Sequence, residues 1–158
     1  MTVYLVRHGA ARSEVEDPAR PLSDLGRDQV RRVACHAAAV GLRVAEIRHS
    51  GLLRARETAE LLAAHLSPGR GVTATEGLHP GDDPGIAQAA IEAAADPLML
   101  VGHLPHLGRL ASALLVGRPN NAIVGFSEAA LACLTKAEGL WLLHWMLTPA
   151  VAPAAAPA

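Results

Sequence analysis

The sequence is poor in aromatic residues, in cysteine and in net charge. Of 158 residues, 51% are hydrophobic but only 3% aromatic, so alanine, leucine and valine must build most of the core. Cys35 and Cys133 stand in no metal-ligand spacing, and we expect buried free thiols, as in a reducing compartment. Fourteen basic and fifteen acidic residues leave a net charge of −1. This balance argues against a nucleic-acid-binding surface.

Long apolar runs are also missing. No stretch is long enough to span a bilayer, and no basic and apolar leader precedes the first strand, so we expect a cytoplasmic protein without membrane contact. The length suits one domain, residues 1–149. The remaining residues, 150–158, consist almost entirely of alanine and proline, and such a segment is expected to be a disordered tail.

Short apolar strands alternate with amphipathic helices along the chain, which predicts an α/β fold with a mainly parallel sheet between two helical layers. Ser23 is placed to cap a helix that ends near Ala39, and Asp83 to cap another that begins near Pro84. Period-two alternation puts Trp141 and Trp145 on the same face of a strand. The predicted strands are 3–6, 44–50, 72–75, 97–103, 129–135 and 140–147, and the helices are 24–39, 54–66, 86–95 and 107–116.

Arg7, His8 and Gly9 follow a strand that is apolar throughout, Val3 to Val6. Such a strand is buried on both faces of a sheet, and ligands of α/β proteins bind at the carboxyl ends of strands. A guanidinium group can grip phosphate oxygens while a neutral imidazole nitrogen attacks phosphorus. From these three residues alone, a phosphate site and a solvated strand end are equally good readings.

Two later segments lead to the same edge of the predicted sheet. Arg54 lies at the start of a helix, whose free amide groups favour an anion. His103 ends a second fully apolar strand, so it can meet His8 at one phosphoryl group. Arg54 could instead pair with Glu57 along the helix. His103 and His106 lack a third ligand for a metal, and we expect His106 to line the pocket rim or to face solvent.

Three short motifs follow one another along the chain: Val6-Arg7-His8-Gly9, Ser50 to Thr58, and Val101-Gly102-His103. Together they resemble the histidine phosphatase superfamily, also called phosphoglycerate mutase-like. The compact length and Leu104-Pro105 make the chain similar to the short phosphohistidine phosphatases of the SixA type. Ala11 and Glu14 stand where the wider family often has threonine and asparagine, so no role is transferred to them.

The resemblance implies a phosphoglycerate mutase-like α/β/α sandwich and catalysis through a phosphohistidine at His8. Arg7, Arg54 and His103 would hold the phosphoryl group, with Gly9 beside it and Arg12 as a further substrate contact or a solvated loop residue. No metal or cofactor would be needed. In many relatives an acid protonates the leaving oxygen, and the candidates in the corresponding loop are Glu76, Asp82 and Asp83.

The short chain predicts an open pocket, which suits a phosphorylated side chain on another protein. An imidazole leaving group needs less help from an acid than an alkoxide does. The expected substrate is therefore a phosphohistidine protein, with inorganic phosphate as product. The alternatives are a phosphatase for small phosphate esters, and a phosphate-recognition module without turnover, for which a nucleophile would be superfluous.

Overall fold

The computed structural model describes residues 1–154, and in this part the strands form one six-stranded sheet in the order β3-β2-β4-β1-β5-β6. The elements follow the chain as β1 (Thr2–Arg7), α1 (Asp24–Ala39), β2 (Glu46–His49), α2 (Leu53–Leu66), β3 (Val72–Ala74), α3 (Pro84–Ala93), β4 (Leu98–Gly102), α4 (His106–Val116), β5 (Leu131–Ala137) and β6 (Leu140–Leu147). Neighbours among the first four strands pair in parallel, whereas β5 is antiparallel to β1 and to β6. The mainly parallel α/β fold is confirmed.

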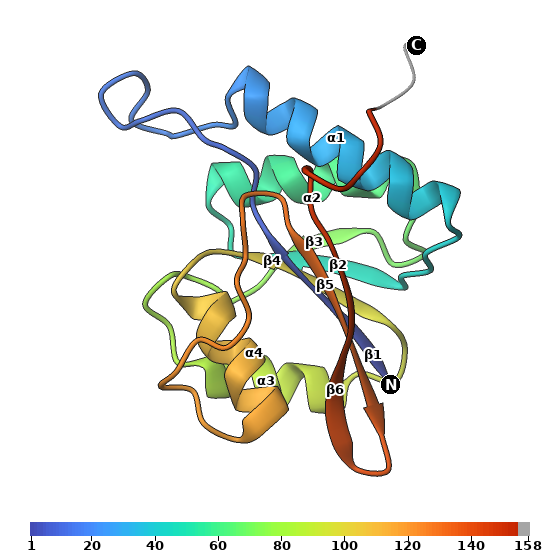
Figure 1. Cartoon of the computed structure of the whole chain (residues 1–158). Helices are drawn as coiled ribbons and strands as arrows, with labels where there is room; N and C mark the ends of the chain where they lie inside the picture. Colours follow the sequence, from blue (N-terminus) through green and yellow to red (C-terminus); the bar gives the residue numbers. More distant parts are fainter. Residues whose placement is uncertain (155–158) are drawn as a thin grey trace.

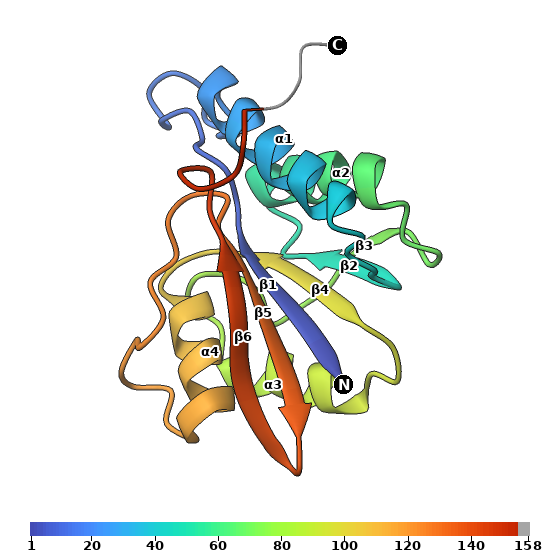
Figure 2. The same cartoon turned by 45° about the vertical axis from the view of Figure 1, so that its right-hand side comes forward.

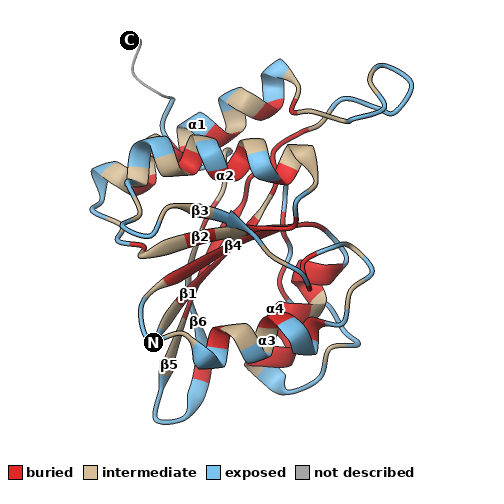
Figure 3. Ribbon diagram, turned by 180° about the vertical axis from the view of Figure 1, so that it is seen from behind, coloured by how far each residue is buried: buried red, intermediate tan, exposed pale blue. Residues whose placement is uncertain are grey.

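The sheet lies between two helical layers (Figure 1). Helices α1 and α2 cover one face, and α3 and α4 cover the other, as the rotated view in Figure 2 also shows. Successive residues of β1 face opposite layers, because side chains alternate along a strand. Tyr4 and Val6 belong to the core under α1 and α2, and Val3 and Leu5 to the core over α3 and α4. The central strands are therefore buried on both sides (Figure 3).

Helix starts follow the predicted caps. The Ser23 hydroxyl accepts a hydrogen bond from Gly26 N at the beginning of α1. The Asp83 carboxylate accepts one from Gly85 N at the beginning of α3, whose first residue is Pro84. In each case the side chain satisfies an amide that has no partner within the helix. None of the described helices is long and apolar enough to cross a bilayer.

The C-terminal hairpin forms as predicted, but its tryptophans do not share a face. Cys133 pairs with Trp145 while Leu134 pairs with Leu143, so a bulge interrupts the alternation in β6. An extra residue in one strand moves the following side chains to the other face. Trp141 consequently lies in the core over α3 and α4, whereas the Trp145 ring lies 6.2 Å from the Tyr4 ring on the opposite face.

A turn lies just past the expected domain boundary at residue 149. A turn follows β6, in which the amide of Ala152 donates to the carbonyl of Thr148 at 2.9 Å. Ala152 is only 3% exposed, and its carbonyl accepts a hydrogen bond from Arg32 of α1 at 3.1 Å. This turn therefore packs against the helix layer, while the disorder of the alanine and proline tail stays a prediction. The prediction for residues 155–158 lies outside the described residues.

Candidate active site

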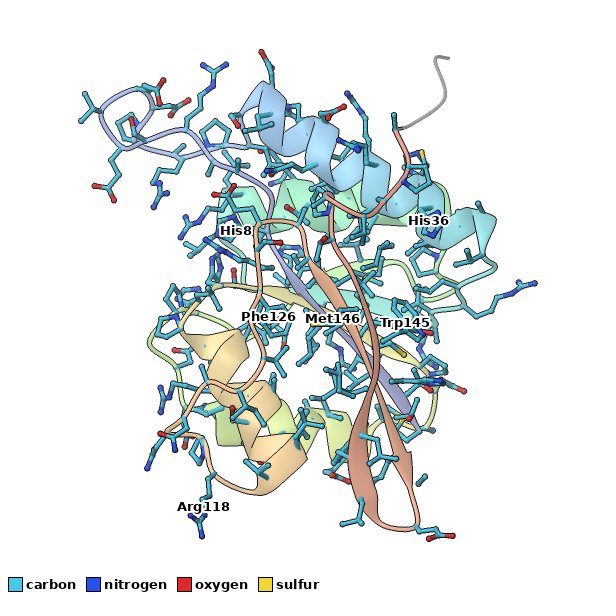
Figure 4. All side chains as sticks on the ribbon, in the orientation of Figure 1. His8, His36, Arg118, Phe126, Trp145 and Met146 are labelled. Atoms are coloured by element: carbon cyan, nitrogen blue, oxygen red, sulfur yellow. The ribbon has the colours of Figure 1, made fainter. Side chains whose placement is uncertain are left out.

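The ends of β1 and β4 bring two histidines together. Arg7 pairs with Gly102 across these parallel strands, and His8 N donates to the Gly102 carbonyl at 3.1 Å. The rings of His8 and His103 follow, with centroids 5.0 Å apart. The predicted meeting of these two imidazoles at one sheet edge is thus what the structure contains. Figure 4 shows His8 at the end of β1, close to the segment that leads into β5.

The hydrogen bond of His8 defines its tautomer. Its Nδ1 lies 2.7 Å from the Gly9 carbonyl oxygen, and a carbonyl only accepts, so Nδ1 carries the proton and Nε2 keeps its lone pair. Burial lowers the pKa of His8 to about 4, helped by the charges of Arg54 and Arg7 and opposed by the Gly9 carbonyl and Glu128. At neutral pH the ring is therefore uncharged and nucleophilic at Nε2.

Ser50 holds the second imidazole. Its hydroxyl lies 2.6 Å from Nε2 of His103 and also accepts a hydrogen bond from Leu52 N. Within residues 1–154, Nδ1 of His103 is buried and has no hydrogen-bond partner. Burial lowers the pKa of His103 to about 3, with contributions from the charges of His8 and Arg54. With Nε2 accepting from Ser50, Nδ1 carries a proton that it can donate to a bound oxyanion.

The two arginines approach from separate elements. Arg7 ends β1, and its Nη1 donates to the Phe126 carbonyl at 2.9 Å. Arg54 lies in the first turn of α2, whose N-terminus has no side-chain cap. Burial lowers the pKa of Arg54, and the charge of Arg20 adds to this. A guanidinium group nevertheless stays protonated in proteins, so both side chains bring permanent positive charge to the histidines.

The alternative pairing of Arg54 with Glu57 does not occur. Glu57 instead forms a 2.7 Å ion pair with Arg27 of α1 and accepts a hydrogen bond from Leu22 N. It faces α1 and fastens the two helices of this layer together. Arg54 is thereby left without a carboxylate partner among the described residues.

Unpaired donors surround this edge of the sheet. Arg7 Nε, Arg54 Nε and His103 Nδ1 are buried and have no hydrogen-bond partner in the described structure. Buried donors of this kind are rare unless a ligand satisfies them. An anion with several oxygens is the class of ligand that supplies such acceptors. The site can therefore hold a phosphoryl group beside a neutral imidazole nucleophile.

Close backbone contacts position the turn after β1. The Gly9 amide donates to the Thr58 hydroxyl at 3.2 Å, and that hydroxyl donates to the Arg54 carbonyl at 2.7 Å. A Cβ atom at Gly9 would lie 2.7 Å from the Gly26 carbonyl oxygen. The absence of a side chain at Gly9 thus lets α1 approach the turn that carries His8.

Arg12 is exposed in the loop that follows this turn, where its carbonyl accepts from Arg20 Nε at 3.2 Å. Its contact with substrate stays a prediction. The charge of Arg20 acts on Arg54, a proximity that the sequence reading missed. The sequence places Arg12 in a loop, but a loop assignment carries no signal for the direction of its arginines.

The three candidate acids differ in whether a backbone amide already donates a hydrogen bond to their carboxylate. Asp83 caps α3, and Asp82 accepts a hydrogen bond from His79 N at 2.9 Å. Glu76 is exposed and lines, together with Ser50, His79 and Asp82, a cavity of about 320 Å³. His79 donates from Nε2 to the Ser50 carbonyl at 2.9 Å. Glu76 is consequently the candidate whose carboxylate is least committed to backbone contacts.

His106 is not at a rim or in solvent. It is 0% exposed, and both ring nitrogens lack partners within the described residues. The prediction was wrong because α4 begins at His106 itself, whose side chain is buried with those of Leu107 and Leu110. The described residues contain no group of three histidine, cysteine or carboxylate side chains that could hold a metal ion. Cys133 is buried and Cys35 half-buried, and both are free.

Comparison with known proteins identifies the family to which this arrangement belongs. The model of the histidine phosphatase superfamily, branch 1, matches residues 3–99. The chain is 41% identical to an uncharacterised protein of Picosynechococcus over 126 residues, which cover 75% of each sequence. It is 28% identical over 155 residues to the phosphohistidine phosphatase SixA of Escherichia coli, covering 94% of both.

A solved structure leads to the same family. The protein histidine phosphatase SixA in complex with tungstate matches 95% of this chain and 98% of its own, with a TM-score of 0.82 and 27% identity. The match therefore extends over nearly the whole length of both chains. The chain belongs to the histidine phosphatase superfamily, branch 1, and has its phosphoglycerate mutase-like α/β fold.

Proposed function

We propose that this protein is a phosphatase that removes the phosphoryl group from phosphohistidine on a partner protein. The observation that supports this proposal most directly is the hydrogen bond from His8 Nδ1 to the Gly9 carbonyl. It leaves Nε2 of His8 free to act as a nucleophile beside the donors of Arg7, Arg54 and His103 that have no partner within residues 1–154. The named relative with that activity, SixA, supports the substrate class.

The reaction has two displacement steps. Nε2 of His8 attacks phosphorus, a new N–P bond forms, and the N–P bond to the substrate imidazole breaks, with that imidazole taking up a proton from solvent water. Water then attacks the phosphoryl group on His8, which releases inorganic phosphate and restores the imidazole. Arg7, Arg54 and His103 Nδ1 stabilise the equatorial oxygens in both steps, as fixed donors do where charge develops.

The leaving group explains why the proposed reaction needs no strong proton donor. An imidazole departs with less proton transfer than an alkoxide, so the site can function although Asp82 and Asp83 serve backbone amides. The arginines supply the positive charge that divalent metals supply in many phosphoryl-transfer enzymes. We accordingly propose catalysis without a metal ion or another cofactor.

A phosphatase for small esters is the second candidate, and Glu76 favours it. This carboxylate lines the cavity beside Ser50, where it could protonate an ester oxygen. A recognition module without turnover fits less well, because binding alone has no use for a free nucleophilic nitrogen.

Turnover of a histidine-phosphorylated protein should be compared with turnover of a panel of small phosphate esters, both in excess chelator. The proposal expects a higher kcat/KM for the phosphoprotein, unchanged by the chelator. Preference for one ester would favour the second candidate. Loss of activity that returns with one particular metal would contradict metal-independent catalysis.

A further inference from the structure

An apolar groove adjoins the phosphate site. It has a volume of about 500 Å³ and lies between the start of α4 and the segment that leads to β5. Leu104 and Ile123 expose 39% and 53% of their surface there. The groove is lined by Leu104, Pro105, Gly108, Arg109, Asn120 and residues 122–126.

Hydrogen bonds hold the outer wall of this groove in place. The buried Ser112 of α4 donates from its hydroxyl to the Asn121 carbonyl and accepts from Ile123 N at 3.2 Å. Val124 and Phe126 are 7% and 4% exposed, so they anchor the same segment in the core. The exposed Ile123 is thus presented by a fixed backbone, which reduces the ordering cost of binding.

Two direct connections join the groove to the catalytic residues. Leu104 and Pro105 follow His103 in the chain. On the opposite wall, the Phe126 carbonyl accepts the hydrogen bond from Arg7. In Figure 4 Phe126 lies below His8, in the segment that runs up to the active-site edge. A substrate whose phosphoryl group reaches His8 therefore has its neighbouring atoms beside this groove.

The lining is apolar except for Arg109 and Asn120. Arg109 takes part in no ion pair within residues 1–154, and no carboxylate lines the groove. An unpaired guanidinium group at the edge of an apolar surface complements an acidic side chain. The preferred occupant therefore combines one apolar side chain with a carboxylate nearby.

We propose that this groove binds an apolar side chain of the substrate protein close to its phosphohistidine, while Arg109 pairs with an acidic neighbour. The inference rests on the proposed function and adds the sequence that the enzyme selects around the phosphorylated residue. A small phosphate compound would leave the groove unused. The groove therefore favours macromolecular substrates over free phosphoramidate.

Synthetic peptides phosphorylated on one histidine provide the probe. Members of the series differ at two adjacent positions within four residues of that histidine. One position carries either leucine or serine, and the position beside it carries either glutamate or lysine. At the position that reaches the groove, leucine with glutamate should raise kcat/KM about tenfold over serine with lysine, which corresponds to about 1.4 kcal/mol. Free phosphoramidate serves as the substrate that cannot reach the groove.

Two variants and two matched controls locate the effect. Ile123→Ser and Arg109→Glu should abolish the leucine and glutamate preferences respectively, and leave hydrolysis of phosphoramidate unchanged. Val116→Ser alters a side chain that is also 53% exposed but lies outside the groove. Arg118→Glu reverses a charge at the far end of α4 (Figure 4). Both controls should retain the wild-type preference, and thermal melts verify folding.

Several results would overturn the inference. Equal turnover of the leucine and serine peptides excludes selection by the groove, as does a preference that survives in both groove variants. Loss of phosphoramidate hydrolysis in a folded groove variant would show an effect on chemistry instead of docking. A wild-type dimer that Ile123→Ser dissociates would assign the groove to a second copy of the chain. If esters are hydrolysed and no phosphohistidine peptide is, the proposed function fails as well.

Discussion

Arg54 and Arg56 lie two residues apart on α2, yet they meet different surroundings. Arg54 is partly buried at the site. Arg56 instead pairs with Glu60, and the side chains of Arg56 and Glu60 are each more than half exposed. Arg54→Ala should lower kcat about 10²–10³-fold with phosphohistidine and with ester substrates, because it removes a donor to the transferring phosphoryl group. Arg56→Ala should change kcat less than twofold, since an exposed ion pair contributes little. Steady-state kinetics that show equal losses in the two variants would exclude the assigned role.

The three loop carboxylates separate the substrate classes. Glu76→Gln, Asp82→Asn and Asp83→Asn should each leave phosphohistidine turnover nearly intact, since the imidazole departs without a strong acid. Glu76→Gln should slow hydrolysis of an alkyl phosphate by ~10²-fold, the lower range for general acid catalysis. Assays on both substrates, with a thermal melt for each variant, test this. A collapse of phosphohistidine turnover in one folded variant would favour the ester phosphatase.

Sequence reasoning predicted which side chains would meet, but not all of the contacts that orient them. Arg7, His8 and His103 could be placed together because apolar strands of a parallel sheet end at one edge. The hydrogen bond between Ser50 and His103 Nε2 was not among the predicted contacts, because it depends on how β2 pairs with β4, where His49 lies opposite Val101. No period or motif carries that information.

At the scale of elements, α1 must approach the turn after β1 very closely. A Cβ atom at Gly26 would lie 1.9 Å from the Ala10 carbonyl oxygen, so a side chain there must push the helix away. Gly26→Ala should lower the melting temperature and reduce activity, because the Gly9 turn that carries His8 moves with it. Gly69→Ala is the control, since a Cβ atom there meets nothing within 4 Å. Equal melting temperatures for both variants would contradict this packing.

Regular elements were predictable because their signals are local. Ser23 and Asp83 mark helix starts through their own side-chain hydrogen bonds, and buried strands appear as apolar runs. The bulge in β6 was missed because alternation alone cannot show where an extra residue enters a strand. Burial of Ala152 was missed for a related reason, since it depends on Arg32 and α1, which lie far away in the sequence.

Across the whole molecule, four buried histidines link stability to pH. Burial lowers the pKa values of His8, His49, His103 and His106 below the usual 6.5, to about 4 for His8 and about 3 for His103. The unfolded chain therefore binds more protons as pH falls below 6.5. The free energy of unfolding should be highest above that pH and should fall as pH decreases toward 4.

His106→Leu should weaken this dependence. The variant removes two buried nitrogens without partners, which cost about 1–3 kcal/mol when unsatisfied, and it removes one group that resists protonation. Its free energy of unfolding should exceed that of the wild type, with a larger difference at pH 5 than at pH 8. Denaturant titrations at both pH values measure this, and His65→Leu on the exposed side of α2 is the control. A variant less stable than the wild type at pH 5 would contradict the account.

The most direct test of the account is to trap the phosphoryl group during turnover. A substrate carrying labelled phosphate should be mixed with the enzyme and quenched in base within milliseconds, because phosphohistidine survives base and is lost in acid. Mass spectrometry should then find the label on His8 of the wild type and on no residue of His8→Ala, which should also lack turnover. Label on a different residue, or undiminished turnover by a folded His8→Ala variant, would contradict the account.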